Sequence, residues 1–317
     1  MQYVLIGNYG VGNLGDEALR EYFLTQFPDV HWNVLSAHSR GDELPRLPAG
    51  IRSFFTPWWK TLHAIRRSDG VVFGGGSLFT DTESSYACFL WWWHVLVACL
   101  LQKKIALAFQ GIGPFRTRRG EWFARSACRM ASHVSVRDSL SRERLEHWKL
   151  NTEVIQTFDP VFSLIDNEKK YLSSKNVFVI VPRKNSSATF QNRARELLDS
   201  RAWDEVRILS MQPDDPEECV LCAQLTTHAA NVRVVPVRLL PELAMHIAAG
   251  TTILTQRYHA ALAALALGKA FEALAQEEGD KLSELTKYQG HSQQCLRLVR
   301  DGEAALRGWL ERRSSSC

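Results

Sequence analysis

The stretch GNYGVGNLGDEAL, residues 7–19, combines glycines with side chains that can bind a ligand. It lies between a strand-like run and an apolar-periodic segment that predicts a helix from about Glu17. Gly10, Gly12 and Gly15 form a literal G-x-G-x-x-G, the pattern of dinucleotide-binding loops. Such a loop lets a backbone approach a ligand closely, because glycine has no Cβ.

The residues around this loop argue against a dinucleotide. The fingerprint needs an acid ~20 residues on, at the end of the second strand, but no carboxylate follows that strand before Asp42. Asp16 and Glu17 lie at the predicted helix N-terminus, which a pyrophosphate would have to share with them. Two hypotheses remain: a structural turn capped by Asp16, or a loop whose Asn8, Asn13 and Asp16 bind sugar hydroxyls.

Polar or glycine-rich motifs also follow other predicted strands. These strands are residues 3–6, 31–35, 70–73, 105–109, 133–136, 153–155, 177–181, 206–209, 232–236 and 252–255. The motifs at their carboxyl ends are GNYGVGNLGDE, GGGSLFTD, QGIGP, RD, DP, PRK and QRYH. In open α/β sheets, ligands bind outside the carboxyl ends of the strands. Seven such motifs in register therefore predict a ligand-binding cleft.

The strands are short, rich in Val, Ile and Phe, and alternate with helical patterns, which is typical of parallel strands buried on both faces. A charged segment without periodicity, residues 163–176, predicts a linker. We therefore expect an α/β protein of two doubly wound Rossmann-like domains that face each other across a cleft, at residues 1–165 and 166–317.

Composition narrows the class of protein. Of the 317 residues, 45% are hydrophobic and 23% charged, as in soluble globular proteins, and the net charge of +4 is too small to argue for nucleic acid. The longest apolar run has 13 residues, fewer than the ~20 that cross a bilayer, and no secretory leader is evident. Seven scattered cysteines favour reduced thiols and a cytoplasmic location.

Taken together, several stretches resemble the polysaccharide pyruvyl transferase family. They are GNYGVGNLGDEAL (7–19), VVFGGGSLFTD (71–81), QGIGP (110–114), VSVRDSLS (134–141), DPVF (159–162) and QRYHAALAALALGKAF (256–271). The resemblance implies a fold similar to GT-B. It also implies transfer of the carboxyvinyl group of phosphoenolpyruvate to a sugar of a cell-envelope polysaccharide or its lipid-linked precursor. The product would be a pyruvate ketal, with release of phosphate.

The donor implied by this resemblance is a small molecule with a carboxylate and a phosphate. Its site needs several fixed cations, preferably guanidinium groups. The candidates are Arg137, Arg257, His259, Lys281 and, more weakly, Arg183. If QRYH is extended, Arg257 and His259 face the same way. His259 is assigned phosphate binding and proton transfer, because imidazole ordinarily titrates near neutral pH.

Acceptor binding is assigned to Asn8, Asn13, Asp16 and Asp81, and catalysis to His259, Arg137 and Asp16. Helix capping is the alternative role for Asp16 and Asp81. No carboxylate or Cys/His cluster has convincing metal spacing, so we expect neither a metal nor a cofactor. Contact with the inner face of the membrane, through the acceptor, and the oligomeric state stay open.

Two other functions remain open on the sequence alone. A nucleotide-sugar glycosyltransferase of GT-B type would need a ribose-binding carboxylate near the last strand–helix unit, for which Glu272 and Glu277 are candidates. A non-catalytic sugar-binding protein would have no specific role for the cationic side chains assigned above to donor binding.

Overall fold

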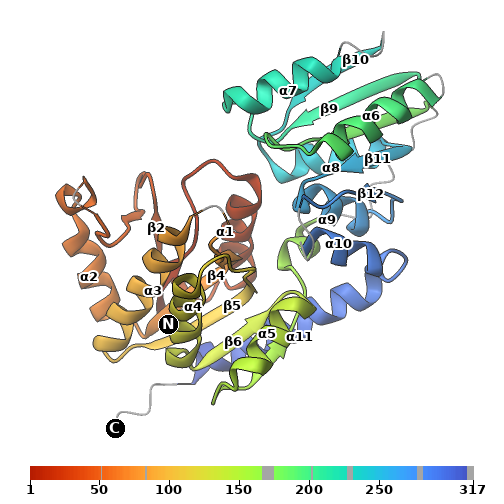
Figure 1. The fold of residues 1–317 in the computed structure, drawn as a ribbon. Coiled ribbons are helices and arrows are strands. Elements are labelled where there is room, and N and C mark those ends of the chain that lie inside the picture. The colour runs from red at the N-terminus through yellow and green to blue at the C-terminus, as the bar shows by residue number, and fades with distance from the viewer. Residues whose placement is uncertain are drawn as a thin grey trace. The chain divides into compact units, whose positions relative to one another are not determined.

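The computed structural model describes residues 1–50, 52–82, 84–165, 175–200, 203–226, 231–276 and 281–312. The chain divides into two compact units. Unit 1 comprises residues 1–12, 16–160 and 297–317, and unit 2 comprises residues 13–15 and 161–296. Each unit is an α/β structure built on one parallel sheet (Figure 1).

Unit 1 has a seven-stranded sheet of order β3-β2-β1-β4-β5-β6-β7. Its strands are β1 Gln2–Ile6, β2 His31–Ser36, β3 Leu44–Pro45, β4 Gly70–Phe79, β5 Lys104–Ile112, β6 His133–Val136 and β7 Val154–Gln156. Its helices are α1 Leu14–Gln26, η1 Arg52–Phe55, α2 Trp58–Arg67, α3 Ser85–Leu100, α4 Arg118–Met130 and α5 Ser139–Trp148, and η2 Pro160–Leu164 begins at its boundary. All the pairings found are parallel, which agrees with strands that are apolar on both faces.

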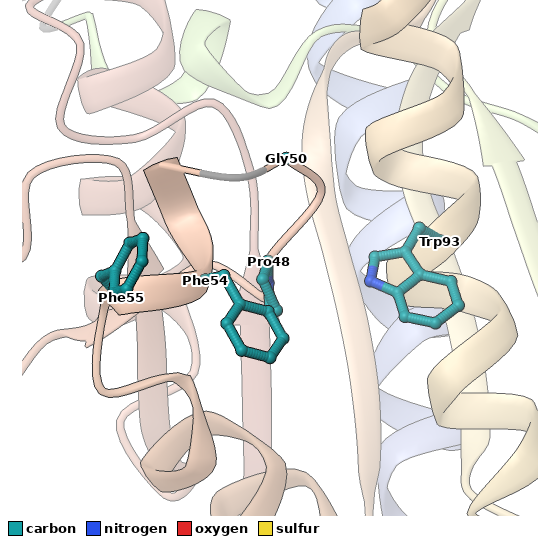
Figure 2. A pocket seen from close by; sticks show the side chains of 5 residues that line it. All are labelled: Pro48, Gly50, Phe54, Phe55 and Trp93. Atoms are coloured by element: carbon teal, nitrogen blue, oxygen red, sulfur yellow. The ribbon is translucent and has the colours of Figure 1, made fainter.

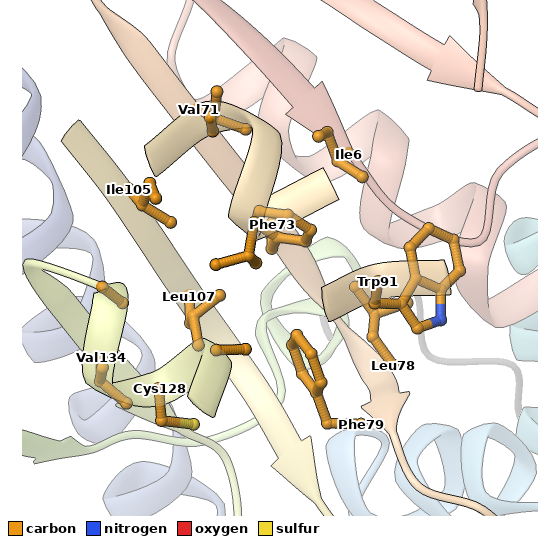
Figure 3. Close-up of a cluster of buried hydrophobic side chains, with 14 of the residues drawn as sticks. Ile6, Val71, Phe73, Leu78, Phe79, Trp91, Ile105, Leu107, Cys128 and Val134 are labelled. Carbon is orange, nitrogen blue, oxygen red and sulfur yellow. The ribbon is translucent and has the colours of Figure 1, made fainter. Parts of the chain in front are cut away.

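Helices cover both faces of this sheet. Alternate residues of the strands, such as Val71 and Phe73, belong to one cluster with Trp91 of α3 and Cys128 of α4 (Figure 3). Apolar residues of α2 and α5 complete this cluster. On the opposite face, α1 places Tyr22 edge-on against Phe109 of β5 at 5.7 Å between ring centroids. The long helix α11 Ser292–Glu311 shares that face, where Trp309 lies 5.7 Å from Tyr3 of β1.

Unit 2 has a five-stranded parallel sheet of order β10-β9-β8-β11-β12. Its strands are β8 Val177–Val181, β9 Glu205–Ser210, β10 Val232–Pro236, β11 Thr252–Thr255 and β12 Glu272–Ala273. Its helices are α6 Ala188–Ser200, α7 Pro216–Thr226, α8 Leu240–Ala249, α9 Tyr258–Ala266, α10 Lys281–Leu285 and η3 Thr286–Tyr288. One core cluster joins β8, β9 and β11 to α6 and α7.

The structure confirms the predicted fold class, and all ten predicted strands are present, with ends that differ by a few residues. It adds the two-residue strands β3 and β12, which the sequence analysis did not predict. Strand β4 continues through the glycines of GGGS to Phe79, with a register shift between Gly76 and Phe79. Most of the predicted linker, residues 166–174, lies outside the described residues.

The expected second domain, residues 166–317, differs from the observed unit at its C-terminal end. From Arg297 onward the chain belongs to unit 1. Tyr3 donates a hydrogen bond to the Leu310 carbonyl at 2.6 Å, and Trp309 donates to Ser132 Oγ at 2.9 Å. The C-terminal part of α11 therefore completes the first unit and is not part of the second.

No helix in the described part of the chain is both long and apolar enough to cross a membrane.

Candidate functional site

The strand order of each sheet defines one place where a ligand is expected. In unit 1 the order reverses between β1 and β4, and in unit 2 between β8 and β11. The loops that follow such neighbouring strands diverge to opposite faces of the sheet and leave a crevice. Four of the seven motifs lie at these four strands: GNYGVGNLGDE after β1, GGGSLFTD at the end of β4, PRK after β8 and QRYH after β11.

The loop after β1 is held by its own helix. Gly10 and Gly12 both have φ of 77°, which favours glycine, and Gly10 N donates a hydrogen bond to Glu17 Oε1 at 2.7 Å. The loop thus already binds a carboxylate, and this argues further against a pyrophosphate. Asn13 Oδ1 accepts from Gly15 N at 3.1 Å, which is the geometry of a helix N-cap. The expectation that Asp16 caps α1 is wrong, because α1 begins at Leu14 and Asn13 is the capping residue.

Asp16 instead takes part in a polar cluster at the carboxyl end of the sheet. Asn8 Nδ2 donates to Asp16 Oδ2 at 2.9 Å, and Asn8 Oδ1 accepts from the Arg46 guanidinium at 3.2 Å. Arg46 also donates to the carbonyls of Gly7 and Tyr9, both at 3.3 Å, and lies over the Trp91 ring at 4.8 Å. Asn8 therefore bridges the carboxylate of Asp16 and the guanidinium of Arg46.

Burial shifts the pKa of both charged groups in this cluster. It raises the pKa of Asp16 to about 6, against the opposing effects of the Asn8 hydrogen bond and of Arg137. It also lowers the pKa of Arg46, which Asp16 partly restores. A carboxyl group with a pKa near 6 can accept and release a proton at neutral pH.

Arg137 follows β6 and is almost completely buried. Its guanidinium forms an ion pair with the fully buried Asp159 and donates to Ser77 Oγ at 3.0 Å. Asp138, the next residue, caps α5 by accepting from Ser141 N at 2.7 Å. The structure thus joins RD, DP and GGGS, three motifs that are distant in the sequence.

Asp81 lies in a different environment. Its carboxylate accepts from Arg116 N at 2.6 Å, from Thr117 N at 2.9 Å and from Thr117 Oγ1 at 2.5 Å. Thr117 in turn caps α4 through Gly120 N. The contacts of Asp81 hold the connection between β5 and α4, and its binding of an acceptor stays a prediction.

In unit 2, Arg257 follows β11 directly and is the N-cap residue of α9. Its guanidinium forms an ion pair with the fully buried Glu218 of α7 and donates to Gln212 Oε1 at 3.0 Å. Burial lowers the pKa of Arg257, while Glu218 raises it and Arg183 lowers it. The segment QRYH is not extended as a whole, because α9 begins at Tyr258.

Arg183 follows β8, the neighbour of β11, and donates to Gln276 Oε1 at 3.0 Å. Two guanidinium groups therefore lie at the point where the strand order reverses, and Glu218 compensates the charge of one. Guanidinium groups are suited to binding a carboxylate or a phosphate.

His259 and Lys281 are both placed by helices of unit 2. His259 lies in the first turn of α9, with its ring edge-on to Tyr258 at 5.4 Å. Lys281 is the first residue of α10 and is only 7% exposed, unlike an ordinary surface lysine. Their roles in donor binding stay predictions.

The alternative function, a nucleotide-sugar glycosyltransferase, and the absence of a metal were two further expectations from the sequence. Glu272, a candidate for ribose binding, is held by Arg193, with Nε 2.8 Å from Oε1 and Nη2 3.0 Å from Oε2. Glu277, the other candidate, lies outside the described residues. Within those residues, no group of three or more His, Cys, Asp or Glu is arranged to hold a metal ion.

Sequence reasoning missed Arg46. The signal was the short segment LPRLP after the second strand, where an arginine stands between two prolines. Because β3 has only two residues, nothing in the sequence marked Arg46 as following a strand.

Comparison with known proteins identifies the family of this chain. Residues 13–277 match the sequence model of the polysaccharide pyruvyl transferase family. The match covers most of the chain, so the chain belongs to this family. No curated protein matches it.

Solved structures show the fold alone. The UDP-GlcNAc 2-epimerase from Methanocaldococcus jannaschii is similar with a TM-score of 0.61 at 11% identity, covering 98% of this chain and 99% of the other. The UDP-GlcNAc 2-epimerase from Neisseria meningitidis has a TM-score of 0.58 at 10% identity, covering 98% and 100%. A glycosyltransferase from Rickettsia africae has a TM-score of 0.54 at 9% identity, covering 98% and 96%. The fold is thus of GT-B type with two Rossmann-like domains.

Proposed function

We propose that this protein transfers the carboxyvinyl group of phosphoenolpyruvate to a sugar of a cell-envelope polysaccharide or of its lipid-linked precursor, and forms a pyruvate ketal. The observation that carries the proposal is the family match over residues 13–277. The chemistry at the two points where strand order reverses supports it, because unit 1 offers a titratable acid and unit 2 offers cations.

The reaction needs proton transfers in both directions. C3 of phosphoenolpyruvate takes a proton, a sugar hydroxyl attacks C2 and loses its proton, and phosphate leaves with the electrons of the C2–O bond. A second hydroxyl then adds to C2 and loses its proton, which closes the ketal. Asp16 is the proposed base for a hydroxyl, since its raised pKa suits proton transfer near neutral pH.

The remaining assignments concern the two substrates. Asn8, Asn13 and Asp81 are proposed to bind the acceptor, while Arg137, Arg183, Arg257, His259 and Lys281 bind the anionic donor. His259 is proposed to hold the phosphate and to supply a proton. The location is proposed to be the cytoplasm, to which the free thiols of the described cysteines are suited.

The activity is tested by ³¹P NMR with phosphoenolpyruvate and candidate acceptors. We expect inorganic phosphate release that depends on the acceptor. His259→Ala should abolish it, whereas His291→Ala, an exposed histidine of the same unit, should not. Release of a nucleoside diphosphate from a sugar nucleotide, without turnover of phosphoenolpyruvate, would instead establish a glycosyltransferase.

Metal dependence gives a second prediction. We expect EDTA to leave the rate of phosphate release unchanged, because arginine, lysine and histidine neutralise the donor in the proposed site. The measurement is the rate before and after chelation and after addition of magnesium. A rate that falls on chelation and recovers with magnesium would contradict this assignment.

A further inference from the structure

An exposed aromatic surface lies at the edge of unit 1, on η1 and the start of α2. Phe54 is 62% exposed, Phe55 84% and Trp59 59%, although they are close in sequence. Thr61 and Ile65 hold α2 to the rest of the unit, so the helix keeps its apolar face buried and still presents Trp59. Three large aromatic side chains in water at one place indicate an interaction surface.

The segment that carries these aromatic residues is basic. Residues 49–67, AGIRSFFTPWWKTLHAIRR, contain four Lys or Arg and no Asp or Glu. Lys60, Arg66 and Arg67 are exposed on α2, and none of the ion pairs found in the described part of the chain involves them. This surface therefore complements a partner that is anionic and has an apolar interior.

A pocket of about 460 Å³ opens beside the same aromatic residues. It is lined by Pro48, Gly50, Phe54, Phe55 and Trp93. Figure 2 shows Phe54 and Pro48 on one side and Trp93 of α3 on the other, with its indole nitrogen toward Pro48. That buried nitrogen has no hydrogen-bond acceptor within the described structure. The lining of the pocket is apolar and aromatic, which suits an apolar chain.

We propose that the surface formed by η1 and α2 docks unit 1 on an anionic phospholipid bilayer. Phe54, Phe55 and Trp59 enter the boundary between head groups and acyl chains, where aromatic rings are favoured. Lys60, Arg66 and Arg67 bind the anionic head groups. The pocket takes part of one acyl chain.

A bilayer fits these observations better than a protein partner does. Lysine is depleted in protein interfaces. Here aromatic and basic residues share one helix face without acids, which is typical of interfacial helices. The inference does not rest on the proposed reaction, because binding is measured without substrates.

The test is sedimentation of the full-length protein with vesicles of phosphatidylglycerol and phosphatidylcholine, compared with phosphatidylcholine alone. We expect binding to the anionic vesicles that weakens with added salt. Phe55→Ser/Trp59→Ser should lower the partition coefficient about tenfold or more. Trp122→Ser, which removes a tryptophan of similar exposure on α4, should bind like the parent.

The charge contribution is tested in the same assay. Arg66→Glu/Arg67→Glu should abolish binding to anionic vesicles, whereas Arg297→Glu/Arg300→Glu, the same change on α11, should retain it. Circular dichroism and the urea midpoint, expected unchanged for these surface variants, show that each protein is folded. A parent that fails to bind, or an aromatic variant that binds equally, overturns the proposal. A dimer that this variant disrupts, without vesicle binding, would identify a second copy as the occupant.

Phosphate release with a water-soluble acceptor separates this inference from the proposed function. We expect Phe55→Ser/Trp59→Ser to keep that activity while it loses vesicle binding. Loss of both together would show that the surface is part of the reaction site, and overturn its role as a separate membrane contact.

Discussion

Burial destabilises the charged form of Asp16, and the carboxyl group lies at the proposed acceptor site, where it can exchange a proton with a hydroxyl. We predict that Asp16→Asn lowers kcat by about 10²-fold or more, because the amide cannot accept the proton of a hydroxyl. In the parent, kcat should rise with pH up to about 6, where Asp16 becomes ionised, and then level off. The pH–rate profile of both proteins checks this. A variant that keeps the same limb near pH 6 would show that another group is the base.

The same substitution has an opposite effect on stability. The pKa of Asp16 is raised from 3.8 to about 6 in the folded protein, so the folded state retains a proton that the unfolded chain loses. The free energy of unfolding therefore falls as pH rises from about 4 to 6. Asp16→Asn should remove this loss and be more stable than the parent at pH 7, but not at pH 4. Urea unfolding at both values measures the difference.

Arg257 has a structural contact that must be separated from its predicted role in donor binding. Arg257→Met leaves Glu218 buried without its countercharge, and we expect a loss of about 3–5 kcal/mol in the free energy of unfolding. Adding Glu218→Gln should restore most of it. Arg238→Met, whose ion pair with Asp214 is exposed, should have a much smaller effect on stability.

The double variant then permits a kinetic test. If Arg257 binds the donor, the KM for phosphoenolpyruvate stays raised in Arg257→Met/Glu218→Gln although stability has returned. A KM equal to that of the parent would make Arg257 a structural residue only.

Some residues of the candidate site could be recognised from the sequence, and others could not. Asn8 and Asp16 were recognisable because they flank a glycine loop, and they do meet in the structure. The ion-pair partner of Arg137 was not recognisable. Asp159 lies in the segment after β7, and no local sequence pattern encodes its contact with Arg137. Arg46 was missed for the same reason.

Among the elements, α11 contains two glycines with opposite surroundings. A Cβ on Gly302 would lie 2.6 Å from Thr157 Cγ2 and 2.7 Å from Phe109 Cε1, whereas a Cβ on Gly308 would meet nothing within 4 Å. We expect Gly302→Ala to destabilise the protein by about 1–3 kcal/mol. Gly308→Ala should stabilise it by up to about 1 kcal/mol, because alanine favours helix. Urea unfolding of both variants provides the comparison, and equal effects would contradict the packing of α11 on β5.

Strands were predictable at the level of elements because the long ones are continuously apolar and separated by helical periods. The strands β3 and β12 have two residues each, too few to show a period. The continuation of β4 through its glycines was also missed, since glycine is disfavoured in strands and its pairing with β5 is a tertiary effect.

At the scale of the whole molecule, unit 1 depends on the C-terminal helix. A chain that ends at Leu296 would lack the buried side chains of Val299, Leu306, Trp309 and Leu310. At about 1.5–3 kcal/mol for each, the loss is comparable to the total stability of a domain. We expect this variant to be insoluble or to show no cooperative unfolding of unit 1. Folding with the parental midpoint would contradict the role of α11.

Because unit 1 needs α11, it cannot finish folding until the end of the chain has been translated. The sheet face that carries Tyr3 and Phe109, on which α1 packs through Tyr22, is complete in the nascent chain long before α11 exists. At about 5–20 residues per second, residues 161–296 take about 7–27 s to translate. Unit 1 therefore waits on the ribosome with an aromatic face exposed while the whole of β8–β12 is made. We therefore expect the N-terminal unit to be the last to finish folding.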